Sequence, residues 1–189
     1  LHDNDPSQPA LLIDNQGLTL GQQGGRANVI GATIAAEGPT VPAVSLVGAA
    51  ANLDSLTMSG NHSGIEWNAD NNGNYPSSLS RTELSGANTC LTLIDHVALS
   101  GYGNTLSAQC TGTILLQNSQ VNWSSLTDAT GTHALQLDST STLHLHQPSG
   151  VDLSLATVSS GAHIDVAWDI TVWVVNTVNN GIPNANVNA

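Results

Sequence analysis

The stretch with the clearest ligand-binding chemistry is NADNNGNY, residues 68–75. Asn68, Asp70 and Asn72 place side-chain oxygens at alternate positions, Asn74 adds another, and Gly73 stands between the last two. Oxygen ligands at positions 1, 3 and 5 followed by Gly at position 6 form the first half of an EF-hand calcium loop. The pattern therefore predicts a calcium site at Asn68, Asp70, Asn72 and Asn74.

This loop departs from the EF-hand pattern in its second half. Position 12, where an EF-hand has Glu, is Leu79, and Asp70 is the one charged ligand. Glu66 or Glu83 would have to complete such a site in the folded chain. The alternative is an Asn- and Gly-rich surface loop, because Asn tolerates left-handed backbone geometry. No other cofactor is indicated.

The histidines form a second group with metal-binding chemistry. His144 and His146 alternate along a strand-like run and would share one face. His133, His163 and Asp138 could lie near them and complete a transition-metal site. Outward polar side chains that are merely solvated explain the same pattern, and neither a CxxC nor an HExxH motif supports a metal.

Two sequons, Asn61-His62-Ser63 and Asn122-Trp123-Ser124, make Asn61 and Asn122 predicted glycosylation acceptors. Such triplets also arise by chance in a chain rich in Asn and Ser. The given sequence begins at Leu1, without a Met or a leader pattern. This start and the two sequons favour a mature or excised piece of an extracellular, cell-surface protein.

The charge content excludes some classes of partner. Charged residues make up 8% of the 189 residues, the net charge is -12, and Arg26 and Arg81 are the basic residues. A phosphate backbone would be repelled, so we expect no nucleic-acid partner. No window contains the roughly 18 apolar residues of a membrane helix, so we expect no membrane insertion in this segment.

Short alternating runs predict strands throughout the chain, while long windows with helical apolar spacing do not occur. Each run puts two apolar side chains on one face and a polar one on the other: Leu18-Thr19-Leu20, Val44-Ser45-Leu46, Leu91-Thr92-Leu93, Leu135-Gln136-Leu137, Leu143-His144-Leu145, Leu153-Ser154-Leu155 and Ile164-Asp165-Val166. With no Phe in the chain, the core must consist of thin layers of aliphatic side chains.

A degenerate repeat indicates how these strands are arranged. The segments LDSLTMSG (53–60), LSRTELSG (79–86) and IDHVALSG (94–101) share an apolar start and a Ser-Gly end. The distance along the chain from the first to the third would be two turns of about 20 residues each, and the second falls out of step. A repeat of this length indicates a solenoid, with a regular sandwich as the alternative.

At these positions the chain resembles a known family. ALLIDNQGLTLGQQGGRANVIGATI (10–34) and PAVSLVGAAANLDSLTMSG (42–60) look like the opening coils of right-handed parallel β-helix proteins of the pectate-lyase-like type. The likeness is one of pattern and extends to about residue 166. It implies an all-β fold with a right-handed parallel β-helix domain over residues 1–166.

A second resemblance covers the end of the chain. WDITVWVVNTVNNGIPNANVNA (168–189) looks like the first strand and turn of an Ig-like or carboxypeptidase-regulatory-like β-sandwich. It implies that residues 167–189 are a linker and the first strand of a following module.

In a parallel β-helix, equivalent positions of neighbouring coils lie about 4.8 Å apart, within the reach of a disulfide. The separation of Cys90 and Cys110 along the chain equals one expected coil. We therefore predict that they stack on adjacent coils and are joined by a disulfide. Two free buried thiols are the alternative.

The enzymes of the resembled family indicate which residues a catalytic site on this scaffold would need. Its lyases need clustered acids and a basic residue, yet Arg26 and Arg81 have no acidic neighbours in sequence. Its hydrolases need convergent acids, and Asp54 and Asp95, at equivalent places of the repeat, would stack roughly 10 Å apart. Two solvated turn carboxylates explain these residues as well.

We therefore expect a non-catalytic structural or adhesive segment of a surface or filament-forming protein. Its partners would be neighbouring copies, other surface proteins or glycans. About eight coils would form a rod near 40 Å long. The alternatives on the same scaffold are a polysaccharide lyase or glycoside hydrolase and a carbohydrate-binding module. A binding module would need an exposed aromatic platform, for which Trp67 and Trp123 are candidates, with a core or rim position as the alternative for both.

Overall fold

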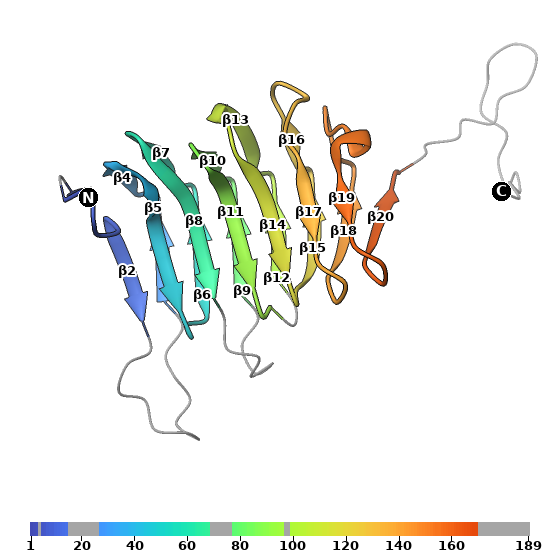
Figure 1. The fold of residues 1–189 in the computed structure, drawn as a ribbon, viewed down its shortest axis with the longest axis horizontal. Coiled ribbons are helices and arrows are strands. Elements are labelled where there is room, and N and C mark those ends of the chain that lie inside the picture. Colours follow the sequence, from blue (N-terminus) through green and yellow to red (C-terminus); the bar gives the residue numbers. More distant parts are fainter. Residues whose placement is uncertain (4, 15–26, 69–76, 97–98, 170–189) are drawn as a thin grey trace, which may run out of the picture.

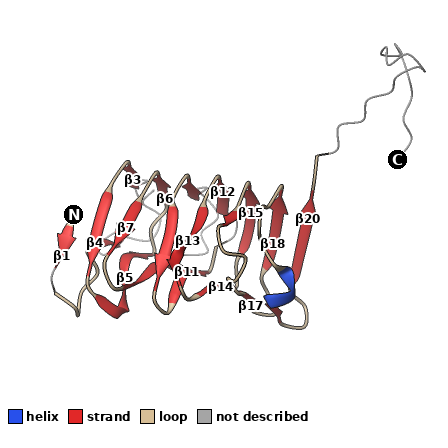
Figure 2. Ribbon diagram, turned by 90° about the horizontal axis from the view of Figure 1, so that it is seen from above, coloured by secondary structure: helices blue, strands red, loops and turns tan. Residues whose placement is uncertain are grey.

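The protein is an all-β parallel solenoid of about six turns, seen from the side in Figure 1 and from above in Figure 2. The computed structural model describes residues 1–3, 5–14, 27–68, 77–96 and 99–169. Each complete turn contributes one strand to each of three faces, and every strand pairing is parallel. Among these residues there is no α-helix, only one 3-10 turn at Leu153–Leu155 and no helix that could cross a membrane.

Two faces are continuous seven-stranded sheets. Sheet 1 consists of β2 (Leu11–Asp14), β5 (Gly38–Val47), β8 (His62–Asn68), β11 (Thr89–Ile94), β14 (Thr113–Gln117), β17 (Leu135–Leu137) and β19 (Thr157–Val158). Sheet 2 consists of β3 (Ala27–Ile30), β6 (Ala51–Asp54), β9 (Ser77–Ser80), β12 (Leu99–Tyr102), β15 (Gln120–Ser124), β18 (Thr142–His146) and β20 (His163–Ala167).

The third face is divided. Its first piece contains β1 (His2–Asp3), β4 (Thr33–Ala36) and β7 (Thr57–Ser59), and its second contains β10 (Glu83–Gly86), β13 (Thr105–Cys110) and β16 (Thr127–Asp128). Where the two pieces meet, the Glu83 amide donates to the Leu56 carbonyl at 3.2 Å, but no strand ladder joins β7 to β10.

The register corrects the predicted repeat. Leu53 pairs with Leu79 in sheet 2, so the first two Ser-Gly segments are in step and lie on adjacent coils. Ile94 belongs to sheet 1 and pairs with Asn68 and Gln117, so the third segment is the one out of step. Because the turns are longer than the predicted period, the chain forms about six turns rather than the expected eight.

Inward side chains form stacked rows that exclude water. One row of sheet 1 runs through Ile13, Leu46, Trp67, Leu93, Leu116 and Leu137. A sheet 2 row places Leu79, Gly101, Trp123 and Leu145 on successive coils. Gly101 leaves the space that the Trp123 indole fills, since a Cβ at Gly101 would overlap that ring. Each fully buried leucine contributes about 2 kcal/mol.

One corner repeats the same backbone turn on six coils. The residue that follows each of the first six sheet 2 strands has a positive φ: Gly31, Ser55, Arg81, Gly103, Ser125 and Gln147. Each of these residues donates its amide to the coil that follows, as Ser55 does to the Ser80 carbonyl at 2.9 Å. The turn redirects the chain in a single residue, and the stacked amides stay satisfied.

Buried polar side chains stack inside two corners. Asn104, fully buried, accepts from the Thr82 amide at 2.9 Å and donates to the Leu79 carbonyl at 2.8 Å. At the other corner, Ser119 accepts from the His96 amide at 3.2 Å. These bonds satisfy backbone groups that the turns would leave unpaired.

The disulfide between Cys90 and Cys110 is present, with the two Cα atoms 5.5 Å apart. It joins adjacent coils, but the predicted stacking of equivalent positions is wrong. Cys110 pairs with Gly86 in the third face. Cys90 does not occupy the position of Gly86 but lies past the corner that follows it, in β11 of sheet 1. The offset arises because β13 carries extra residues between its pairings with Leu84 and Gly86.

The last turn differs from the sequence-based expectation. Leu153-Ser154-Leu155 is a 3-10 turn with both leucines exposed rather than a strand. The Asp152 carboxylate accepts from the Ser154 amide and caps this turn. Residues 170–189, which hold most of the predicted sandwich strand, and Leu18-Thr19-Leu20 lie outside the described residues.

Candidate functional site

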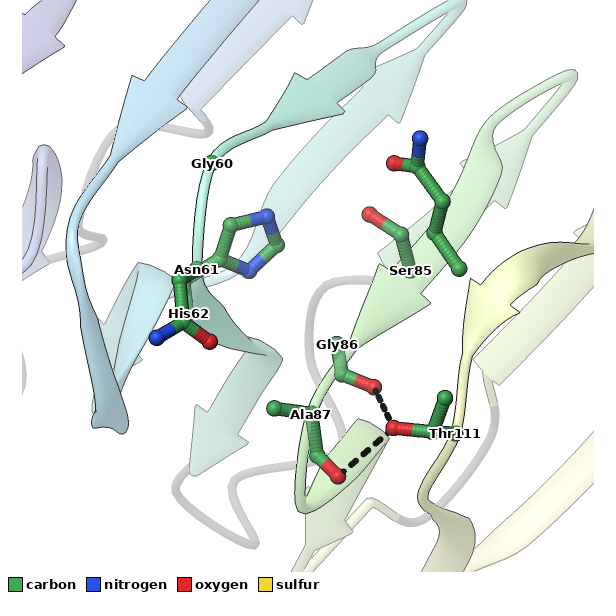
Figure 3. A pocket seen from close by; sticks show the side chains of 8 residues that line it. Gly60, Asn61, His62, Ser85, Gly86, Ala87 and Thr111 are labelled. Atoms are coloured by element: carbon green, nitrogen blue, oxygen red, sulfur yellow. Dashed lines mark hydrogen bonds between the residues drawn. The ribbon is translucent and has the colours of Figure 1, made fainter.

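A pocket of about 210 Å³ opens where the third face is divided (Figure 3). Asn61 lies in the corner between β7 and β8, His62 begins β8, and β10 supplies Ser85. Gln109 lies near the end of β13, and Thr111 follows that strand. The pocket thus spans three successive coils. It exists because β7 and β10 do not pair and because the bulged end of β13 departs from regular stacking.

The pocket is lined by uncharged hydrogen-bonding groups. His62 is buried, and its Nδ1 lies 2.9 Å from the Ser63 carbonyl oxygen. Thr111 Oγ1 donates toward the Ala87 and Gly86 carbonyls, as the dashed lines in Figure 3 indicate. Ser85 Oγ is buried and has no hydrogen-bond partner in the described part of the chain.

Close backbone packing holds the floor of the pocket in place. Gly86 has a φ of 155°, and a Cβ there would lie 2.5 Å from the Gly64 amide nitrogen and would overlap the Thr89 carbonyl. The Cys90–Cys110 disulfide ties the same corner to the next coil. We therefore expect the pocket to be preformed rather than created by a ligand.

Sheet 2 presents a flat polar surface on another side of the solenoid. Its central outward row contains Asn28, Asn52, Ser78, Ser100, Asn122, His144 and Asp165 on successive coils. The first five are uncharged amides and hydroxyls. At strand spacing they form a regular series of hydrogen-bonding groups.

Both predicted glycosylation acceptors have exposed side chains. Asn61 stands at the rim of the pocket, and Asn122 lies in the middle of the flat surface of sheet 2. Ser63 of the first sequon is buried and donates to the Pro39 carbonyl at 3.0 Å. Glycan attachment at either Asn stays a prediction.

The predicted calcium loop falls largely outside the described residues. Asp70, Asn72 and Asn74 lie there, and only Asn68, the last residue of β8, is placed. Glu66 points outward from sheet 1, whereas Glu83 belongs to the third face. The calcium site stays a prediction.

The histidine group is not brought together. His144 and His146 do share the outward side of β18, and they face Asp165 and Asp169 at 3.0 Å each. His133 is buried in another part of the fold. Among the residues described, no three His, Cys, Asp or Glu side chains are close enough to hold a metal.

The buried pair of Asp128 and His133 was missed by sequence reasoning. His133 Nδ1 lies 2.6 Å from Asp128 Oδ1, and His133 Nε2 lies 2.5 Å from the Cys110 carbonyl oxygen. Both ring nitrogens of His133 therefore face oxygen atoms that accept hydrogen bonds. Nothing in the local spacing marks this pair, since Asp128 occupies an inward position that Leu84 and Leu106 fill on earlier coils.

Hydrogen bonds govern the charge of Asp128. Burial by itself would raise the pKa of this carboxyl group, but the amides of Thr130 and Gly131 and the ring and amide of His133 stabilise the carboxylate. The net effect holds the pKa of Asp128 below its ordinary value.

The residues considered for catalysis and sugar stacking lie apart. Asp54 ends β6 in sheet 2 and pairs with Arg81, whereas Asp95 follows β11 of sheet 1, so the predicted stacking of the two aspartates is wrong. Trp67 and Trp123 are both buried in the core and form no exposed platform.

Comparisons of the chain with protein-family models, with curated proteins and with solved structures find no match.

Proposed function

We propose that this chain is a non-catalytic structural and adhesive segment of an extracellular surface or filament-forming protein. The observation that carries the proposal is the unbroken stacking of sheets 1 and 2 through seven strands each. Backbone hydrogen bonds run along the solenoid axis on two faces, so a load along that axis passes through every coil interface, where the hydrogen bonds of both sheets share it. Six turns at the strand spacing correspond to a rod about 30 Å long.

The surface chemistry supports an interfacial role beside the mechanical one. The outward row of Asn28, Asn52, Ser78, Ser100 and Asn122 is uncharged. The Ser78 hydroxyl donates to the Asn52 side-chain oxygen within the row, and the exposed Asn28, Ser100 and Asn122 offer amides and a hydroxyl to neighbouring copies, to other surface proteins or to glycans. The disulfide supports an oxidising, extracellular location, because disulfides persist mainly there.

Two finer features belong to the same proposal. The solenoid is right-handed, as parallel crossover connections almost always are. Residues 167–189 lead into a following β-sandwich module, so the rod is one part of a modular protein.

The alternatives are a polysaccharide lyase or hydrolase and a carbohydrate-binding module. The polar pocket beside Asn61 favours the binding module over the enzyme, because its lining contains no carboxylate. Incubation of the protein with neutral and acidic polysaccharides, followed by chromatography for released oligosaccharides, separates the classes. We expect no release, and turnover would overturn the structural role.

The mechanical role has its own test. A chain tethered through residue 1 and residue 169 is pulled in a force spectrometer, beside the same chain with the disulfide reduced. We expect stepwise lengthening in units of one coil, the chain length between equivalent positions such as Val44 and Ile65 or Ile65 and Leu91. Extension without resistance would contradict a load-bearing solenoid.

A further inference from the structure

The pocket beside Asn61 contains an unsatisfied group that points to a ligand. Ser85 is 4% exposed, and its Oγ has no hydrogen-bond partner among the described residues. A buried hydroxyl left unpaired is costly, and native structures rarely retain one without a reason. In Figure 3 the Ser85 hydroxyl and the His62 ring face the same space from its two sides.

The lining offers both donors and acceptors. Because His62 Nδ1 meets the Ser63 carbonyl, which only accepts, that nitrogen carries the proton and Nε2 of the neutral ring is an acceptor. Thr111 Oγ1 uses its proton on a backbone carbonyl at 2.9 Å and retains acceptor capacity. The Ser85 hydroxyl and the Gln109 amide each both donate and accept.

Size and charge narrow the class of ligand. The described lining contains no Asp, Glu, Lys or Arg, and the Glu37 carboxylate beside it accepts from the Asn61 backbone amide at 3.4 Å, so an anion finds no counter-charge in the lining. The volume of about 210 Å³ is below the range of pockets for drug-sized ligands. A small neutral molecule with several hydroxyl or amide groups fits both properties.

We propose that this pocket binds one neutral pyranose residue, with Ser85, His62 and Gln109 as its hydrogen-bonding partners. The exposed Asn61 lies at the rim, so the sugar can come from two sources: a glycan attached to Asn61 or a free neutral saccharide. This site does not depend on the mechanical role, because a load-bearing solenoid can exist with or without it.

The free-saccharide source is tested on protein produced without glycosylation. Saturation-transfer NMR with N-acetylglucosamine and with methyl glucoside measures binding, which for a ligand of this size is on the order of millimolar. We expect Ser85→Ala and Gln109→Ala to weaken binding by about 3- to 10-fold, the effect of one lost hydrogen bond. Ser160→Ala, at an exposed serine in the turn before β20 and outside both the pocket and the outward row of sheet 2, is the matched control and should leave binding unchanged.

The attached-glycan source is tested on protein from a glycosylating host. Mass spectrometry reports whether Asn61 is occupied, and the rate of enzymatic deglycosylation of the folded protein reports whether the first sugar is shielded. We expect Ser85→Ala to increase that rate at Asn61 and to leave the rate at Asn122 unchanged.

The two arms together decide the proposal. Binding of a free sugar alone assigns the pocket to an external saccharide, and shielding alone assigns it to the Asn61 glycan. Absence of both overturns the proposal, whether or not Asn61 is occupied. Ser85→Ala should fold, because it removes an unpaired buried hydroxyl, and Gln109→Ala alters an exposed side chain and provides an independent variant.

Discussion

The substitution Asp128→Asn should strongly destabilise the fold. Asp128 and His133 side chains are 0% and 3% exposed, and the carboxylate accepts from the Thr130, Gly131 and His133 amides in addition to the His133 ring. Asn has one acceptor oxygen where the carboxylate has two, so at least one of these buried donors loses its partner. A buried donor left unpaired costs about 1–3 kcal/mol and more where the bond is to a charged group, so we expect a loss of about 3 kcal/mol.

Urea unfolding at pH 7 measures this loss, with Asp165→Asn as the matched control. Asp165 faces His144 at 3.0 Å, but both side chains are at least half exposed, so its removal should cost less than about 1 kcal/mol. A double variant, Asp128→Asn with His133→Gln, should lose less than the sum of the two single variants.

The pH dependence provides a second readout. Because the folded-state pKa of Asp128 is lowered, its stabilisation is present above the unfolded value of about 3.9 and is lost as the pH falls through the folded value. The difference between wild type and Asp128→Asn should therefore shrink in strongly acidic solution. An Asp128→Asn variant within about 0.5 kcal/mol of wild type at pH 7, the usual range of a surface substitution, would contradict this role of the buried carboxylate.

Three further outcomes follow from the same structure. Replacing Cys90 and Cys110 together by Ser should lower the unfolding free energy by about 3 kcal/mol, because the disulfide closes a loop of one coil. If the urea midpoint of the wild-type protein were the same with and without reductant, this prediction would be wrong. Gly101→Ala should cost about 1–3 kcal/mol in urea unfolding, since its methyl group would overlap the Trp123 ring, while the added Trp123→Leu should restore part of the loss. Burial lowers the pKa of His96 to about 4, so on acidification the unfolded chain binds a proton at this residue before the folded chain does. The stability of the fold should therefore fall as the pH drops from 6.5 to 4. Thermal unfolding of His96→Gln across that pH range should show a smaller fall in stability.

Local patterning was a sound guide to the strands wherever a coil is stacked on both sides. Leu135-Gln136-Leu137 and Leu143-His144-Leu145 are strands with buried leucines and outward polar centres. Leu153-Ser154-Leu155 has the same pattern but forms a 3-10 turn with exposed leucines. The alternating pattern predicts which side chains can share a face. A strand forms only where a neighbouring coil completes its backbone hydrogen bonds.

The pocket could not be derived from the sequence, although Asn61 belongs to a sequon and Ser85 and Gly86 end a repeat segment, because neither motif indicates that these residues line one cavity. Asn61, Ser85 and Gln109 are widely separated along the chain, and they meet because one face of the solenoid is divided and β13 carries a bulge. The predicted site residues show the same limit. The cysteine pair was recognised as a link between coils, but its exact partner positions followed from that bulge.

Composition and alternation by themselves determined an all-β chain that is poor in charged residues, stacks its strands and joins coils through Cys90 and Cys110. These are local properties, since the alternation of side chains along a strand and the low content of charged residues can both be read from a few neighbouring residues. The register, the place of Asp128 and His133 in the interior and the pocket beside Asn61 were decided by the tertiary structure. Each depends on which residues lie one coil away, and insertions between strands shift that spacing without changing the local pattern.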